Sequence, residues 1–291
     1  MSKRPLWLIC APVIFLFLWS AGFAIAKLGL QHAEPFTILA LRYVCVLALL
    51  VPLALILRPP MPKTWRAVAD VGLVGFLIQV VYFGFCYTAF KSGMSAGSVA
   101  IIVCLQPILV ALVAPYLVGE CISLRGWIGL ALGLFGAATV IFSQQKIGGE
   151  SLFGIGCTVV ALLGITSGTL WEKRFGVSHH PISANLIQYA VGAAFAVPAA
   201  WVSEGMAIDW TPAFVGVMIY LVVGNSLLAM SLLLAMIRLG EVSRVSSLFY
   251  LVPPLSAVCA WPLLGEAMQP LAWFGMAFAA VGVALVSRKP R

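Results

Sequence analysis

The chain has 291 residues, of which 63% are hydrophobic and only 9% are charged. Because a soluble domain carries about 25% charged residues, this composition excludes a soluble globular protein and predicts an integral membrane protein. The net charge of +8 then reflects Lys and Arg in loops on one side of a membrane, and we predict no nucleic-acid partner.

Apolar stretches long enough to cross a membrane follow one another along the chain. A spanning helix needs about 20 apolar residues, and ten stretches qualify. The first is too long for a signal peptide and lacks a clear cleavage site, so we interpret it as a retained helix. Short connections predict antiparallel neighbours in one bundle. The predicted helices are Pro5–Ala26, Pro35–Leu57, Val71–Phe90, Ser92–Gly119, Gly126–Gln145, Ser151–Trp171, Pro181–Ser203, Trp210–Ile237, Val245–Gly265 and Ala267–Ser287.

Positive charges gather on one side of the predicted bundle. With the N-terminus inside, thirteen Lys and Arg residues fall in the inner segments and three in the outer ones. Since cytoplasmic loops are enriched in Lys and Arg, we predict that the N-terminus and the C-terminus are both cytoplasmic. The inner residues are Lys3, Arg4, Arg58, Lys63, Arg66, Arg125, Lys173, Arg174, Arg238, Arg244, Arg288, Lys289 and Arg291, and the outer ones are Lys27, Lys91 and Lys146.

The second half of the chain repeats the first at a shift of 146 residues. Five helices in each half is an odd number, so the second half enters the membrane from the opposite side. The fold class predicted is therefore an all-α membrane protein with two inverted five-helix repeats, residues 1–145 and 146–291. Such repeats are typical of secondary transporters with a site near the midplane; the alternative is duplication that only builds a stable bundle. The matched pairs include Gly22 and Gly168, Lys27 and Lys173, Pro35 and Pro181, Tyr43 and Tyr189, Pro52 and Pro198, Gly119-Glu120 and Gly265-Glu266, Trp127 and Trp273, Gly129 and Gly275, and Gly136 and Gly282.

The fourth and ninth predicted helices carry prolines near their middle. A proline removes one backbone hydrogen bond and clashes with the carbonyl four residues back. Carbonyls freed at that depth could accept hydrogen bonds from a substrate amine, although a kink needed only for packing or hinge motion is an equal alternative. The prolines and the residues whose carbonyls they free are Pro107 with Val103, Pro253 with Phe249, and Pro254 with Tyr250.

Amide side chains lie at matched depths in the two halves. Gln79 of the third predicted helix maps onto Asn225 of the eighth, and Gln106 precedes the proline of the fourth. A polar side chain at that depth is costly unless it faces the bundle interior or a cavity. We therefore predict that these amides line the cavity, with hydrogen bonding between helices as the alternative.

Arg42 is a charged residue inside a predicted helix, and Gln188 stands at its matched position. Its guanidinium could bind an anion or a substrate carboxylate. A side chain that extends to the interface, or a salt bridge with Glu34, is at least as good an interpretation from sequence alone.

Aromatic residues near the predicted midplane are candidates for contact with the apolar part of a substrate. We place Trp19, Phe23, Tyr82 and Tyr250 on the cavity, although aromatic residues in a membrane bundle more often face lipid or pack between helices. Trp19 is the strongest of these candidates because it is not repeated: Ile165 stands at its matched position.

Chemistry beyond binding has no candidate residues. The seven cysteines are scattered with no metal-ligand spacing, and neither a nucleophile motif nor a glycine-rich phosphate loop is present, so we predict no enzyme activity, no metal and no cofactor. The acidic residues fall at predicted helix ends or in loops, which favours a neutral or zwitterionic cargo over a cation. These residues are Glu34, Asp70, Glu120, Glu150, Glu172, Glu204, Asp209, Glu241 and Glu266.

Several short motifs stand out along the chain. They are Trp19-Ser20-x-Gly22-Phe23-x-x-x-Lys27, Arg42-Tyr43, Pro107, Gly119-Glu120 and Trp127-x-Gly129, followed by Pro254, Gly265-Glu266 and Trp273-x-Gly275 in the second half. These motifs resemble those of the EamA-type drug/metabolite transporters, and among these most of all the YddG-type amino-acid exporters. The resemblance implies ten helices in two inverted repeats around a cavity that opens alternately to each side, and it implies amino-acid export, as in many bacterial members.

The leading hypothesis is a secondary transporter that exports neutral or aromatic amino acids, or similar small metabolites, across the plasma (bacterial inner) membrane by alternating access. Its expected partners are the substrate and the lipid bilayer, and we expect a monomer or a weak homo-oligomer. The first alternative is an exporter of drugs or of other metabolites such as nucleotide-sugar-like anions. A non-transporting membrane scaffold is a remote one.

Overall fold

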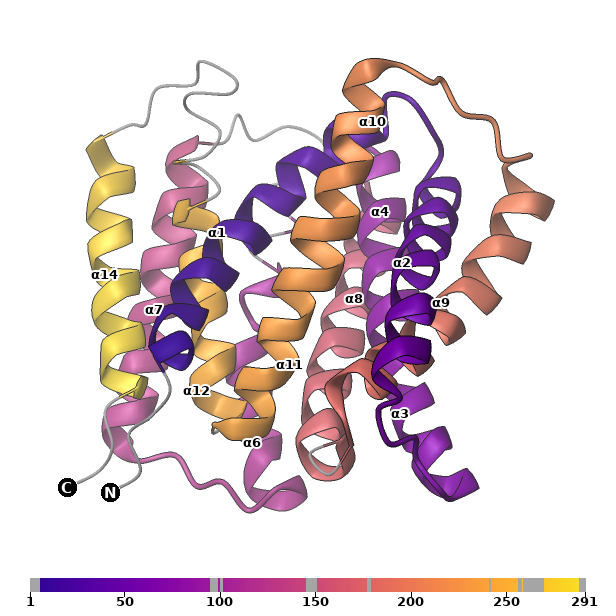
Figure 1. Ribbon diagram of the computed structural model, residues 1–291. Helices are drawn as coiled ribbons and strands as arrows, with labels where there is room; N and C mark the ends of the chain where they lie inside the picture. The colour runs from indigo at the N-terminus through magenta and orange to yellow at the C-terminus, as the bar shows by residue number, and fades with distance from the viewer. Residues whose placement is uncertain are drawn as a thin grey trace.

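The computed structural model describes residues 6–94, 99, 102–144, 151–176, 179–240, 242–255, 258 and 270–287. Within these residues the fold is all-helical, apart from an isolated bridge between Ala33 and Ile208 (Figure 1). The helical elements are α1 (Leu6–Gly29), α2 (Pro35–Leu57), α3 (Trp65–Gly75), η1 (Phe76–Tyr82), α4 (Phe83–Lys91), α6 (Gln106–Leu117), α7 (Leu124–Gln144), α8 (Leu152–Trp171), η2 (Glu172–Gly176), α9 (Pro181–Ser203), α10 (Pro212–Ile219), η3 (Tyr220–Ala229), α11 (Met230–Leu239), α12 (Val242–Ser247), η4 (Leu248–Leu251) and α14 (Pro270–Ser287).

Six helical stretches of the described chain are long and apolar enough to cross a membrane, so the protein is a multi-pass membrane protein. The ten-helix count stays a prediction, because the predicted fourth and ninth helices, the motif Gly265-Glu266 and the boundary between residues 145 and 146 include positions outside the described residues. The six stretches are Cys10–Gly29, Pro35–Leu57, Trp65–Lys91, Leu152–Gly176, Pro181–Ser203 and Pro212–Leu239, and the shorter apolar helices are Gln106–Leu117, Leu124–Thr139 and Trp273–Val286.

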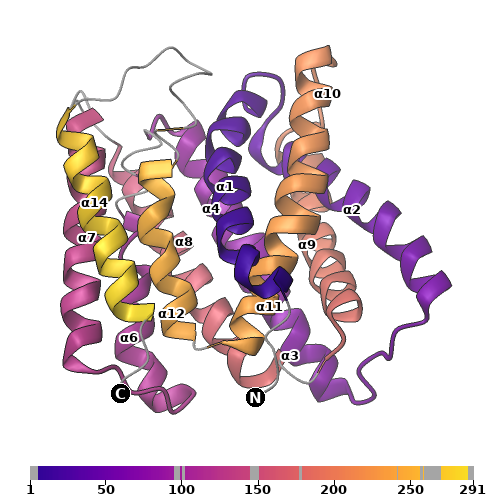
Figure 2. The same cartoon turned by 60° about the vertical axis from the view of Figure 1, so that its left-hand side comes forward.

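The helices form a bundle in which α1 begins and α14 ends at the same end (Figures 1 and 2). We call this the N-terminal end of the bundle. From it, α1 runs toward the opposite end, as α7 does, while α14 returns. Which side of the membrane the N-terminal end faces stays a prediction.

Glycines allow α7 and α14 to pack at close range as an antiparallel pair. A Cβ on Gly136 would lie 2.5 Å from the carbonyl oxygen of Gly275, and a Cβ on Gly129 would lie 2.7 Å from that of Gly282. Distances this short leave no room for a side chain, so the close approach of the two helices requires glycine at these positions. The contacts are also reciprocal, because Gly275 and Gly282 stand 146 residues after Gly129 and Gly136.

Two of the long helices change to π-helical hydrogen bonding near their middle. One consists of α3, η1 and α4, the other of α10, η3 and α11, and η1 shifted by 146 residues falls inside η3. In each, a tyrosine hydroxyl donates to a carbonyl of the π segment: Tyr43 to Gln79 at 2.6 Å and Tyr189 to Ser226 at 2.8 Å. Tyr43 and Tyr189 are themselves a matched pair. Single π turns occur frequently at functional sites.

The predicted prolines mark breaks in helical geometry. A turn at Cys104 and Leu105 precedes α6, which begins at Gln106 with Pro107 in its first turn, where a missing N–H costs little. The predicted continuous helix is therefore interrupted at this point. Before Pro253 and Pro254, the chain forms the 3₁₀ segment η4, since neither proline can donate the hydrogen bond of an α-helix.

Candidate functional site

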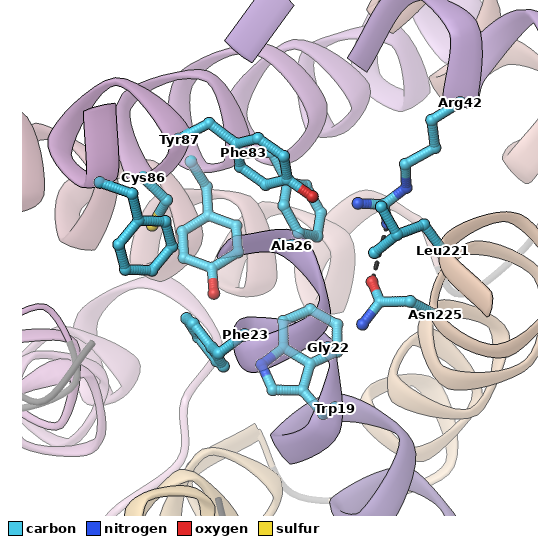
Figure 3. A pocket seen from close by; sticks show the side chains of 12 residues that line it. Trp19, Gly22, Phe23, Ala26, Arg42, Phe83, Cys86, Tyr87, Leu221 and Asn225 are labelled. Atoms are coloured by element: carbon cyan, nitrogen blue, oxygen red, sulfur yellow. Dashed lines mark hydrogen bonds between the residues drawn. The ribbon is translucent and has the colours of Figure 1, made fainter. Parts of the chain in front are cut away.

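A pocket lies between the second half of α1 and the length of α4, with Arg42 of α2 and the π segment η3 closing it (Figure 3). Its cavity volume is about 20 Å³, room for roughly one water molecule. Half of its lining residues are aromatic, and the only charged side chain among them is that of Arg42. The lining residues are Trp19, Gly22, Phe23, Ala26, Arg42, Tyr82, Phe83, Cys86, Tyr87, Phe90, Leu221 and Asn225.

Arg42 is held in the pocket wall by neutral groups of η3. The side chain is completely buried. Its Nε donates to Ser226 Oγ at 2.5 Å, and its Nη2 donates to Asn225 Oδ1 at 2.8 Å, the bond drawn in Figure 3. The guanidinium carbon lies 4.4 Å from the centre of the Phe83 ring, within the range of a cation–π interaction. These contacts fix the plane of the guanidinium.

No carboxylate balances this charge within the part of the chain that the structure describes. Glu34, the alternative partner considered from sequence, pairs with Lys91 at 2.5 Å instead. Complete burial also shows that Arg42 does not extend to the interface, so both of these interpretations are wrong. The third nitrogen, Nη1, has no hydrogen bond of normal geometry to any described residue, and the Tyr87 and Tyr189 hydroxyls lie close enough to interact with the guanidinium. A buried charge whose described neighbours are all neutral is expected to serve a ligand.

The aromatic wall of the pocket is centred on Trp19, whose side chain is 2% exposed. Its ring stacks on Tyr82, with centres 6.2 Å and planes 12° apart, and contacts Phe83 at 5.9 Å. Phe23 meets Phe90 edge to face at 6.4 Å. Trp19, Phe23 and Tyr82, predicted as cavity candidates, thus lie together with Arg42 and Asn225.

Other candidates lie elsewhere. Gln79 is buried against α9. A Cβ on Gly192 of that helix would lie 2.9 Å from the Cβ of Gln79. Gln106 donates to Thr169 Oγ1 at 3.5 Å, and Val103 is part of the buried core. None of the three lines the pocket.

The ninth predicted helix also contributes less than expected. The Phe249 ring packs on the far side of Trp19, with centres 5.7 Å apart, and its carbonyl accepts a hydrogen bond from Cys104 Sγ at 3.7 Å. Tyr250 packs against α7, where a Cβ on Gly133 would lie 2.4 Å from its ring. The carbonyl of Phe249 therefore already has a donor, and Tyr250 does not line the pocket.

The π segment explains why one stripe of the third helix divides between two faces. Gly75, Gln79, Tyr82 and Cys86 follow at i, i+4, i+7 and i+11, a spacing that predicts one face of a regular α-helix. The i→i+5 bonds of η1, however, insert an extra residue. Gly75 and Gln79 consequently face α9, where a Cβ on Gly75 would lie 2.5 Å from the Cα of Gln188. After the π segment the face that meets the pocket comprises Tyr82, Phe83, Cys86, Tyr87 and Phe90.

Sequence reasoning missed four of the pocket's larger side chains and one polar anchor. Phe83, Tyr87 and Phe90 follow at i, i+4 and i+7, a spacing that places them on one helical face, so the signal was present. Leu221 and the anchor Ser226 gave none, because their relation to Arg42 depends on how α2 packs on η3.

Known proteins similar to this chain are membrane transporters. The EamA-like transporter family matches twice, over residues 6–142 and 144–288. The chain is 24% identical to the "Uncharacterized transporter YvbV" of Bacillus subtilis (strain 168), over 94% of this chain and 89% of that protein. It is 22% identical to the "Probable amino-acid metabolite efflux pump" of Salmonella typhimurium, over 97% and 94% of the two chains. A crystal structure that is 17% identical shares the fold, with a TM-score of 0.80 over 96% of this chain and 97% of that one. The chain belongs to the EamA-like transporter family.

Proposed function

We propose that this transporter exports amino acids with neutral or aromatic side chains across the bacterial inner membrane, and that it has no enzyme activity. The observation that carries the proposal is the guanidinium of Arg42, buried without a counter-charge among the described residues on the wall of an aromatic pocket. A relative at 22% identity is named a probable amino-acid metabolite efflux pump, which supports the same substrate class.

Arg42 would bind the substrate carboxylate. Its Nη1 is the donor left over after Ser226 and Asn225 have taken the other two nitrogens, and an arginine–carboxylate bond is about twice as strong as a neutral hydrogen bond. The rings of Trp19 and Phe23 would hold the side chain. A ligand carboxylate would also supply the charge that Arg42 lacks, so binding removes the cost of a buried unpaired cation.

The proposed mechanism is alternating access by two inverted five-helix repeats, with both termini cytoplasmic and the protein working as a monomer or weak homo-oligomer. The support is reciprocal contacts at the 146-residue shift: Gly136 with Gly275 and Gly129 with Gly282 between α7 and α14, and a tyrosine bonded to each π segment. Because the cavity holds only about one water molecule, the helices around the pocket must separate to admit an amino acid.

The test is counterflow of radiolabelled L-phenylalanine into proteoliposomes. Removing the charged donor in Arg42→Gln should lower the initial rate at least about tenfold, as expected for a lost hydrogen bond to a charged group. Arg125→Gln, at an exposed position outside the pocket, should keep the wild-type rate. No flux above that of empty liposomes, for L-phenylalanine or any other amino acid tried, would contradict the proposal.

The same assay separates the alternatives. Preferential flux of cationic drugs or nucleotide sugars would support the first alternative, an exporter of drugs or of other metabolites. A non-transporting scaffold would show neither flux nor a shift in melting temperature with any ligand, because a ligand stabilises only a protein that binds it.

A further inference from the structure

An ion pair lies buried near the N-terminal end of the bundle, away from the pocket. Glu172 Oε1 accepts from Arg238 Nε at 2.5 Å, and the two side chains are 0% and 7% exposed. Glu172 appears from sequence to stand at a helix end, but the helix continues through η2 to Gly176. The carboxylate lies against that last residue, where a Cβ on Gly176 would be 2.4 Å from Glu172 Oε2. The pair joins η2 to α11.

Two polar atoms beside this pair have no hydrogen-bond partner among the described residues. Gln188 Nε2 donates to Glu172 Oε2 at 3.4 Å, which leaves Gln188 Oε1 as a free acceptor. Arg238 Nη1 donates to the carbonyl of His179 at 2.8 Å, which leaves Nη2 as a free donor. A buried polar atom without a partner is costly, so the cluster has unused capacity for one donor and one acceptor.

The other charges nearby have partners of their own. Lys173 donates to the carbonyl of Gly240, and Arg174 donates to that of Leu117. On α3, Asp70 accepts from the Trp171 indole at 3.2 Å. Glu172 and Arg238 are therefore the two opposite charges that join η2 to α11, beside the bond from Lys173 to the carbonyl of Gly240 at the end of α11.

The cluster occupies the position in the second half that corresponds to the pocket in the first. Shifting by 146 residues takes Ala26 to Glu172 and Arg42 to Gln188, and both Ala26 and Arg42 line the pocket. Because the second half runs in the opposite direction, the corresponding place lies toward the other end of the bundle. The ion pair thus fills the space that a second pocket would occupy.

We propose that Glu172, Gln188 and Arg238 form a second amino-acid site, closed by its own ion pair until a zwitterion replaces that pair. Separating two buried charges leaves each uncompensated. A zwitterion compensates both: its ammonium donates to Glu172 and to Gln188 Oε1, and its carboxylate accepts from Arg238. An amine without a carboxylate compensates only Glu172, and an acid without an ammonium compensates only Arg238. The site rests on the proposed amino-acid transport and gives it specificity for zwitterions.

The experiment compares the two orientations of membrane vesicles from cells that express the protein. In inside-out vesicles the proposed site meets the medium, under the predicted topology. The key variant is Glu172→Gln/Arg238→Gln, because replacing both members of a buried pair by neutral residues avoids an uncompensated charge. The measured quantities are the apparent KM for L-phenylalanine and the inhibition constants of phenylethylamine and 3-phenylpropanoate. Arg174→Gln is the control in the same turn.

We expect the double variant to raise the KM about tenfold to a hundredfold in inside-out vesicles, as for one or two lost charge-assisted hydrogen bonds. In right-side-out vesicles the KM of the double variant should stay within twofold of the wild-type KM. Arg174→Gln should leave the KM unchanged in both orientations. The wild type should resist both one-charge analogues, and the double variant should lose that discrimination. An unchanged KM, or an equal rise in both orientations, would overturn the second site. Absence of L-phenylalanine flux in the wild type would instead overturn the proposed function.

Discussion

At the scale of single residues, the position of Arg42 is set by packing against Asn225. The Asn225 side chain reaches Arg42 across the backbone of α1 at Gly22, where a Cβ would lie 2.2 Å from Asn225 Nδ2. A glycine at this point lets η3 approach α1 closely enough for the amide oxygen to accept from Arg42 Nη2. The orientation of the arginine thus depends on a glycine of the pocket wall.

Gly22→Ala should therefore weaken substrate binding. The added methyl displaces the Asn225 amide, so that Arg42 loses one of its two anchors, and we expect the apparent KM for L-phenylalanine to rise about tenfold, the cost of one hydrogen bond to a charged group. The matched control is Gly168→Ala, whose Cβ would press on Ile78 Cγ1 at 2.6 Å. It should lower the melting temperature and leave the KM unchanged. Equal effects of both variants on KM would contradict this role for Gly22.

At the scale of elements, the two π segments decide which residues reach the site. In η3 the π geometry presents both Asn225 and the next residue, Ser226, to Arg42. In η1 it turns Gln79 toward α9 and brings Phe83 to the pocket. The matched amides therefore have different surroundings, because of the two only Asn225 lines the pocket.

The tyrosines bonded to these segments should stabilise them. Tyr43→Phe and Tyr189→Phe each remove a hydroxyl that donates to a π-segment carbonyl from a fully buried position. We expect each to lower the free energy of unfolding by about 1–3 kcal/mol, because the carbonyl is left unsatisfied. Melting in detergent would measure the effect, with Tyr116→Phe, 90% exposed, as the control. Losses no larger than that of the control would show that the π segments do not depend on these bonds.

These elements also show how far sequence reasoning reaches. The 146-residue shift predicted that Tyr43 corresponds to Tyr189 and Gly136 to Gly282, and both pairs make matching contacts. Proline chemistry predicted a kink or a freed carbonyl near Pro107, and the structure interrupts the helix with a turn at Cys104 and Leu105. The orientation of Gln79 could not be predicted, since regular α-helical spacing is the only register that a sequence offers. Likewise, the burial of Arg42 away from any described carboxylate could not be predicted. It results from the packing of helices that are distant in sequence, which a local pattern does not encode.

At the scale of the whole molecule, the pocket and the Glu172–Arg238 pair lie toward opposite ends of one bundle. The pocket is narrow but has an unpaired donor at Arg42, whereas the other position is closed by charge pairing. An alternating-access transporter needs such a difference between its two ends, because opening both at once would let solutes leak. We therefore expect the pocket wall to be reached from one side of the membrane only.

Cys86 can report that sidedness, since it lines the pocket and is 2% exposed. In a variant that keeps only this cysteine, a membrane-impermeant maleimide should react from the side opposite the N-terminal end, and only as the pocket opens. L-phenylalanine at 100 times its dissociation constant leaves about 1% of the protein free. It should therefore slow the reaction about a hundredfold, because bound substrate fills the space beside the thiol. A variant that keeps only Cys104, buried but outside the pocket, should show no protection. Labelling of Cys86 from the N-terminal end, or no protection by any substrate that is transported, would contradict this arrangement.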